Sequence, residues 1–302
     1  MLTIGIIAIA ILMLLPILWL ILAVISVLDS VFYKIKKAKP LTIDINQAGN
    51  RIVSIGHSTV LIQLDGLNII TDPIFSTHIL GFTKRHIEPG IPFKKLPKIN
   101  AIIISHEHDD HFDKATLKKF DKNIPIVIPE GLKHDVMKLG FKDIRGLKWW
   151  EKTEIGGLRI TAAPAKHFLS RIISCVIEGT KTVYFAGDAG LSDYFGGIGK
   201  KFNIDVAMLP MGAYRPFLSF VIPHFSKYSE KVHIIPKDIS MVQEWLKAKV
   251  VIPIHWDVFK ISYSVDFVEK PGKKMKEIIS KQNLDSKIKI LEPGGILDLK
   301  IY

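Results

Sequence analysis

Cysteine is nearly absent from this sequence. Cys175 is the single cysteine among 302 residues, so the chain cannot form an internal disulfide, a composition that suits a reducing compartment. It lies in the apolar run 172–177, where a small buried side chain is expected rather than a nucleophile. Low-complexity segments and short-period repeats are also absent. The roughly 260 residues after the first forty are enough for one large domain or two tightly packed halves.

Charge is absent from residues 3–28, a stretch of 26 residues. About 20 apolar residues suffice to cross the hydrocarbon core of a bilayer, and Pro16 would kink such a helix without preventing a span. A cleaved signal peptide is the alternative, but no lysine or arginine precedes the run and no small-x-small cleavage site follows it. We therefore predict a transmembrane anchor in residues 1–30, a basic linker in residues 31–41 and one domain over residues 42–302.

Positive charge lies on only one side of this predicted anchor. No cation precedes it, and the lysines that follow it are Lys34, Lys36, Lys37 and Lys39. The positive-inside rule then predicts a single-pass membrane protein with its large domain in the cytoplasm. Against Asp29 these lysines give residues 1–40 a net charge of +3, which leaves +9 of the total +12 for the rest of the chain. The excess favours an anionic partner, either a phosphate-bearing substrate, an acidic membrane surface or nucleic acid.

Strands and helices alternate through the rest of the chain, which indicates a layered α/β domain. Strands are predicted from short apolar runs at 52–55, 60–64, 67–71, 126–128, 158–163, 181–186, 205–209, 250–254 and near 288–301. Helices are predicted at 114–120, 130–139, 240–248 and 271–282. Asp65-Gly66 has the residue types of a two-residue hairpin turn between the second and third of these strands.

The main chemical signal is the stretch 105–111, which reads Ser-His-Glu-His-Asp-Asp-His. It follows the apolar run 101–104, so it lies where a predicted strand ends. Side chains at i and i+2 of an extended chain point the same way, so His106 and His108 can hold one metal ion. Asp110 and His111 follow a turn and can face a second ion. Imidazole and carboxylate suit zinc and its neighbours, and a solvated charged loop is the alternative.

This stretch resembles the H-x-H-x-D-H signature of the metallo-β-lactamase superfamily, and its surroundings resemble the N-acyl-phosphatidylethanolamine phospholipase D-like branch. The segments that carry the resemblance are 56–60 (GHSTV), 71–75 (TDPIF), 147–151 (LKWWE), 185–190 (FAGDAG), 211–214 (MGAY) and 254–256 (IHW). They follow the order found in the family and cover roughly residues 50 to 260. The resemblance implies an αββα four-layer sandwich, here preceded by the N-terminal transmembrane helix.

The resemblance also implies a full set of ligands for two ions. His167 would complete the first site, His255 would complete the second, and Asp188 would bridge the ions. The predicted metal ligands are therefore His106, His108, Asp110, His111, His167, Asp188 and His255. Asp72 would support the ligands from behind, and the predicted catalytic residues are Asp110, Asp188 and His233, the last for substrate contact or proton transfer. The ions are expected to be zinc, and the same ligands accept manganese or iron.

Substrate contacts are predicted at His57, Trp149, Tyr214, Phe217 and Phe220. His57 is as well explained by a structural hydrogen bond as by a place in the site wall. Trp149 and Trp150 could line an apolar pocket or belong to the core. The apolar and basic residues of 214–232 could dip into a bilayer or pack on the domain.

Hydrolysis is the predicted reaction, since two ions can activate water and polarise an ester. The favoured prediction is a membrane-anchored phosphodiesterase that acts on phospholipid. The alternatives are an anchored hydrolase of a soluble substrate such as a sugar-phosphate lactone, then a nuclease, then a non-catalytic metal-binding membrane protein. Two departures from the branch weaken the favoured prediction: the Trp-containing segment expected between His167 and Asp188 is absent, and Ile235 replaces an aspartate before Pro236. The predicted partners are the lipid bilayer and a phosphate-containing substrate, with nucleic acid disfavoured. The oligomeric state stays open.

Overall fold

The computed structural model describes residues 34–79, 83–167, 170–212, 234–259 and 271–302, together with six separate positions before residue 34. Those six positions, Leu14, Ile17, Leu20, Ile21, Val24 and Leu28, are helical and exposed. Most of the predicted anchor lies outside the described residues. Within the described part of the chain, no helix has both the length and the apolar character needed to cross a membrane.

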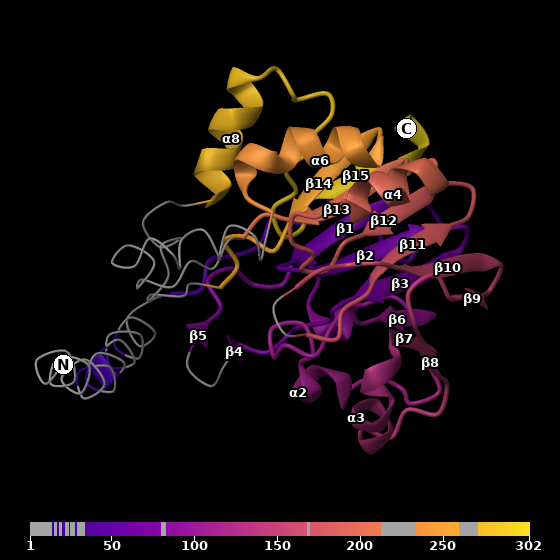
Figure 1. Ribbon diagram of the computed structural model, residues 1–302. Helices are drawn as coiled ribbons and strands as arrows, with labels where there is room; N and C mark the ends of the chain where they lie inside the picture. Colours follow the sequence, from indigo (N-terminus) through magenta and orange to yellow (C-terminus); the bar gives the residue numbers. More distant parts are fainter. Residues whose placement is uncertain are drawn as a thin grey trace, which may run out of the picture.

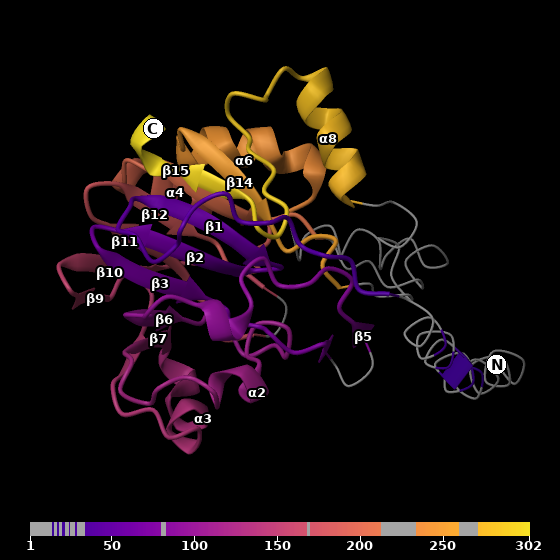
Figure 2. The same cartoon turned by 180° about the vertical axis from the view of Figure 1, so that it is seen from behind.

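Two sheets pack face to face (Figures 1 and 2). The first has the order β15 (Ile296–Asp298), β1 (Arg51–Gly56), β2 (Thr59–Leu64), β3 (Leu67–Thr71), β6 (Ala101–Ile103), β7 (Ile126–Pro129) and β8 (Ile144–Leu147). The second has the order β14 (Val250–Ile254), β13 (Val206–Pro210), β12 (Thr182–Phe185), β11 (Ser174–Glu178), β10 (Leu158–Ala163) and β9 (Lys152–Ile155). A separate pair joins β4 (His78–Ile79) to β5 (Thr83–Lys84).

Helices cover the outer face of each sheet. The helices α2 (Lys114–Leu117) and α3 (Lys133–Lys138) lie on the first sheet, and α4 (Tyr194–Lys201), α6 (Ile239–Leu246) and α8 (Pro271–Lys281) lie with the second (Figure 1). Three apolar cores separate the layers, one between the sheets and one under each helix layer. This arrangement confirms the predicted α/β fold with αββα layers.

The strand residues bury both of their faces. In β2 every residue from Thr59 to Leu64 is buried, because one face meets the other sheet and the other face meets the helix layer. Sheets covered on both sides are expected to have such continuous apolar strands rather than alternating ones. The hairpin turn joins β2 to β3 as predicted, and Asp65 and Gly66 both have positive φ, at 51° and 80°. Register across β1 and β2 pairs Ile52 with Ile62.

Strand direction brings the chemical residues to one edge. The strands β3, β6, β7 and β8 are parallel, and β1 runs the same way because β2 is antiparallel to both β1 and β3. In the second sheet β12, β13 and β14 are parallel, and β10 shares their direction through the antiparallel β11. The loops that follow β1, β3, β6, β10, β12 and β14 carry His57, Asp72, the stretch 105–111, His167, Asp188 and His255. The carboxyl ends of the two sheets therefore supply one common site.

Candidate metal centre

Three histidines form the first group of candidate ligands. Nδ1 of His108 lies 3.0 Å from Nε2 of His106 and 3.2 Å from Nε2 of His167. With zinc–nitrogen bonds of about 2.0–2.1 Å, two nitrogens of a tetrahedral site are separated by roughly 3.3 Å. These two separations suit one ion, and all three nitrogens lie within 4.8 Å of one another, as the family resemblance implies for this trio.

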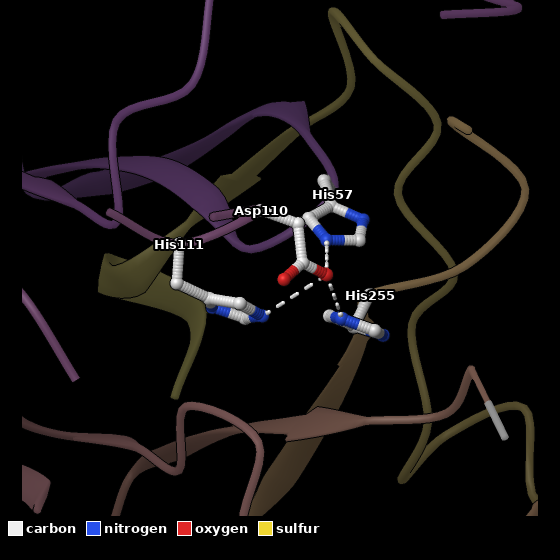
Figure 3. A group of neighbouring side chains, drawn as sticks. All are labelled: His57, Asp110, His111 and His255. Atoms are coloured by element: carbon white, nitrogen blue, oxygen red, sulfur yellow. Dashed lines mark hydrogen bonds and ion pairs between the residues drawn. The ribbon is translucent and has the colours of Figure 1, made fainter. Parts of the chain in front are cut away.

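The second group centres on the Asp110 carboxylate (Figure 3). Its Oδ2 lies 3.1 Å from Nε2 of His57, 3.3 Å from Nε2 of His255 and 3.7 Å from Nε2 of His111. The last two are predicted ligands of the second ion. His57 was not predicted as a ligand, but it contacts the predicted ligand Asp110 and its side chain is 1% exposed.

Asp188 lies between the two groups. Its Oδ2 is 3.1 Å from Nε2 of His111 and 3.3 Å from Nε2 of His255, both in the second group. The same oxygen is 3.9 Å from Nε2 of His167 in the first group. One carboxylate oxygen thus faces ligands of both groups, which is the position that a bridging ligand requires. The ligand roles themselves stay predictions.

Asp72 fixes the orientation of two histidines from behind. Nδ1–H of His111 donates to Oδ2 of Asp72 at 2.7 Å, and the hydroxyl of Ser105 donates to the same oxygen at 2.6 Å. The backbone N–H of Ser105 donates to Oδ1 at 2.7 Å. Since the Ser105 proton points at Asp72, Nδ1–H of His106 donates to the Ser105 oxygen at 2.9 Å. When the two rings are neutral, their proton is on Nδ1 and Nε2 faces the site as a possible ligand, the usual effect of such supporting carboxylates.

The buried donor set suits a divalent ion. His111 is fully buried, and its Nε2 has no hydrogen bond of good geometry to any residue that the structure describes, although Oδ2 of Asp188 lies 3.1 Å away. A buried nitrogen without a hydrogen bond costs about 1–3 kcal/mol unless something else satisfies it. A metal ion between Asp110, His111, His255 and Asp188 would satisfy it, because neutral imidazole and carboxylate are the ligands that zinc, manganese and iron accept.

The histidines of the site differ in the direction of their pKa shifts. Burial, helped by the neighbouring His255, lowers the pKa of His57 to about 3, so its ring is neutral. Burial also lowers the pKa of His106 well below its usual value. Burial opposes a charged His111 as well, but the Asp188 and Asp110 carboxylates outweigh it and raise the pKa of His111 well above its usual value. In the metal-free protein a proton on His111 thus supplies positive charge beside the two carboxylates, where a metal ion would otherwise supply it.

Strained backbone accompanies these residues. His57, Asp72 and His255 have φ values of 59°, 33° and 61°. Such values are uncommon outside glycine and cost on the order of 1–3 kcal/mol each, and they cluster at functional sites. The first and last of the three are joined, because the backbone N–H of His255 donates to the carbonyl of His57 at 3.0 Å. Their rings also pack at a centroid distance of 4.0 Å.

A cavity of about 500 Å³ opens beside the first group. Its lining includes His167, Trp149, Lys148, Lys166 and Arg171. Trp149, predicted as a substrate contact, is thus at the site and 44% exposed rather than in the core. Three further predicted substrate contacts, Tyr214, Phe217 and Phe220, lie outside the described residues, as does the predicted catalytic residue His233.

Comparison with known proteins identifies the family. The family model described as Beta-lactamase superfamily domain matches residues 67–256, which is more than half of the chain. The chain belongs to the β-lactamase superfamily. Within it, the chain is 30% identical over 254 residues to N-acyl-phosphatidylethanolamine-hydrolyzing phospholipase D 1 of Caenorhabditis elegans, an alignment that covers 74% of this chain and 68% of that protein. It spans 47% of the mitochondrial protein of the same description from Saccharomyces cerevisiae.

Two further matches cover nearly the whole of the other protein. A metal-dependent hydrolase of Methanopyrus kandleri is 25% identical over 256 residues, covering 81% of this chain and 97% of that protein. A crystal structure of a possible metal-dependent hydrolase from Veillonella parvula superposes with a TM-score of 0.71 at 17% identity, covering 83% of this chain and 99% of that one. The structural match shows the fold. The family, the relatives and the candidate ligand groups make this superfamily member a metal-dependent hydrolase that resembles the phospholipase D branch.

The sequence missed one contributor to the site and left the role of another open. Ser105 relays Asp72 to His106, and its signal was its place directly before the histidine cluster. His57 was predicted either in the site wall or in a structural hydrogen bond, and the structure gives it a hydrogen bond to Asp110 inside the site.

Proposed function

We propose that this hydrolase is a dinuclear phosphodiesterase that acts on phospholipid, with an N-acyl-phosphatidylethanolamine as its substrate and its N-terminal segment as a membrane anchor. The observation that carries the proposal is the position of Asp188 between two groups of nitrogen ligands. The choice of substrate is supported by the 30% identity to a phospholipase D of that description. The uncharged run 3–28 supports the anchor.

A pair of divalent ions, when bound, supplies Lewis acidity and lowers the pKa of water so that it attacks at neutral pH. The residues of this chain divide the remaining tasks. His106, His108 and His167 would hold one ion, and Asp110, His111 and His255 the other, with Asp188 shared. Asp72 holds His111 and, through Ser105, His106 in the tautomers that leave Nε2 without a proton.

Substrate orientation would come from the cavity beside His167. Lys166 lines it and favours a negatively charged group near the first ion, whereas Arg171, also in the lining, already pairs with Glu107 at 3.2 Å. In the net reaction, water adds to phosphorus and the bond to the N-acylethanolamine oxygen breaks, giving phosphatidic acid and N-acylethanolamine. The departing oxygen takes a proton, and we assign His233 or a water as the proton donor.

The test is mass spectrometry of lipids after incubation of the zinc-loaded protein with N-acyl-phosphatidylethanolamine vesicles. We expect phosphatidic acid and N-acylethanolamine in equal amounts from the wild type, and neither from Asp188→Asn. Bound metal is measured in both proteins, so that a loss of ions is separated from a loss of chemistry. Intact lipid alongside cleavage of an aryl phosphodiester or a sugar-phosphate lactone would overturn the lipid assignment while keeping the hydrolase. The cationic lining of the cavity would then favour a soluble anionic substrate.

A further inference from the structure

The turn between β8 and β9 exposes two tryptophans. Trp149 is 44% exposed and Trp150 is 43% exposed. The backbone N–H of Glu151 donates to the carbonyl of Lys148 at 3.0 Å, which closes a four-residue turn with the tryptophans at its two central positions. This turn links the last strand of the first sheet to the last strand of the second, at one edge of the sandwich (Figure 1).

Trp150 occupies a position that suits glycine. Its φ is 73°, a left-handed conformation that is strained for a bulky side chain. Turns that need a positive φ at their third residue usually place glycine or asparagine there. Trp150 therefore adds backbone strain without gaining a buried environment for much of its ring. Local stability does not explain this residue, whereas a function of its exposed side chain does.

Other exposed residues extend the surface around this turn. The Tyr194 ring, 39% exposed, meets the Trp149 ring edge-to-face at a centroid distance of 5.5 Å. The ammonium group of Lys201 lies 5.0 Å from the centroid of the Trp150 ring. Both partners belong to α4, far from the turn in the sequence. We call Trp149, Trp150, Tyr194 and Lys201 the aromatic patch.

The chemistry of the aromatic patch suits a lipid–water interface. Tryptophan and tyrosine have apolar rings with a polar N–H or O–H, and they concentrate at the headgroup level of bilayers. Lysines beside such rings meet anionic headgroups, each contributing attraction that salt screens. The aromatic patch also adjoins the cavity beside His167, because Trp149 and Lys166 line that cavity.

We propose that the aromatic patch docks on the surface of an anionic bilayer and places the entrance of the cavity beside His167 against the headgroups. The choice of lipid as the partner rests on the proposed function. The docking surface itself is inferred from the strain at Trp150, the exposed rings and the neighbouring lysines. A site that receives its substrate from a bilayer has to face that bilayer, and this edge of the sandwich presents a cavity next to the predicted ligand His167.

The test uses the full chain in lipid nanodiscs with and without phosphatidylglycerol. Lys152→Cys places a unique label next to the turn, because Cys175 is buried and burial raises its thiol pKa, so it does not react. An environment-sensitive fluorophore on this cysteine reports contact with lipids that carry a quencher near the headgroup. We expect quenching that is stronger in anionic discs, and a several-fold loss of it on adding Trp150→Gly. Ile301→Gly, at another exposed apolar side chain, is the matched control and is expected to leave quenching unchanged.

Thermal unfolding of Trp150→Gly separates docking from a structural role. Glycine relieves the positive φ, so we expect the melting temperature of this variant to stay equal or rise while lipid contact falls. A lower melting temperature would make Trp150 a structural residue and overturn the proposal. The proposal would also be overturned if the label is not quenched, or if Trp150→Gly leaves the quenching unchanged. Quenching of equal strength in neutral and anionic discs would overturn an anionic bilayer as the partner. The readout needs no hydrolysis, so quenching in anionic discs that also contain N-acyl-phosphatidylethanolamine, with that lipid left uncleaved, would reject the proposed function and keep the docking surface.

Discussion

His57 and Asp110 meet at 3.1 Å, from Nε2 to Oδ2, although one follows β1 and the other follows β6. The same oxygen of Asp110 faces His255 at 3.3 Å, and His57 contacts His255 through both its ring and its backbone carbonyl. Because burial keeps the His57 ring neutral, its Nε2–H donates to the carboxylate as an uncharged donor. His57 thus positions two predicted ligands of the second ion.

His57→Ala is therefore expected to weaken binding of the second ion by about 10- to 100-fold, the usual cost of losing such a supporting contact. His57→Gln keeps an N–H donor at similar reach and should recover part of the affinity. Stepwise metal titration against a chromophoric chelator measures both constants. The exposed His134→Ala is the control. Wild-type affinity in His57→Ala would exclude a positioning role, and equal losses in both variants would make His57 a ligand.

Asp72 is expected to support affinity for metal without binding it. Asp72→Asn keeps one acceptor oxygen but loses the charge that receives hydrogen bonds from His111 and Ser105. We expect metal affinity to fall by about 10- to 100-fold. A visible spectrum of the cobalt-substituted variant should still show the ligand set of the wild type. A changed set of ligands would instead place Asp72 in contact with an ion.

Protons and metal should compete at His111. The folded, metal-free protein holds the pKa of His111 above its ordinary value of 6.5, since the Asp188 and Asp110 carboxylates outweigh burial. Below pH 6.5 the folded, metal-free protein has the full stabilisation from this proton. The stabilisation is lost as the pH rises through the raised pKa of the folded state, because His111 of the folded protein then loses the proton that the unfolded chain has already lost. The gap in melting temperature between metal-loaded and chelator-treated protein should therefore widen as the pH rises above 6.5. Scanning fluorimetry over a pH series measures it, and a gap that narrows with rising pH contradicts the prediction.

Lys166 is expected to act on substrate binding. It lines the cavity beside His167, and it forms no ion pair with any residue that the structure describes. Lys166→Gln should raise KM for an anionic ester roughly fivefold and leave kcat unchanged, since a single charge-assisted contact contributes about 1 kcal/mol at an exposed site. Lys148→Gln is a matched control from the same cavity, where the ammonium group already pairs with Glu130 at 3.3 Å. Equal effects of the two substitutions would reject a specific role for Lys166.

Local sequence patterns predicted the strands that end at the site and the histidines of the stretch 105–111 as metal ligands. Long apolar runs such as 101–104 and 250–254 allow little else than buried strands. The helix α4 was missed because Tyr194–Lys201 contains three glycines, which lower helix propensity, and its packing against α6 decides its structure. The contacts of His57 with Asp110 and His255 could not be foretold, because they join three loops that only the assembled sheets bring together. Trp150 shows the same limit, since its exposure depends on a turn between two sheets.

Gly187 is expected to set how closely the Asp188 loop approaches the histidine loop. Its φ is 57°, and a Cβ at this position would lie 2.4 Å from Cβ of Ser105, the residue that relays Asp72 to His106. Gly187→Ala should push these loops apart and lower metal affinity by at least about tenfold, because both Asp188 and His106 would move. Gly66→Ala is the matched control, since Gly66 also has positive φ, at 80°, but nothing lies within 4 Å of its added Cβ. Both substitutions should lower the free energy of unfolding by about 1–2 kcal/mol through backbone strain. Only Gly187→Ala should change the metal content, which plasma mass spectrometry measures after dialysis. Metal loss in both variants would mean that general destabilisation, not the approach of the two loops, controls metal binding.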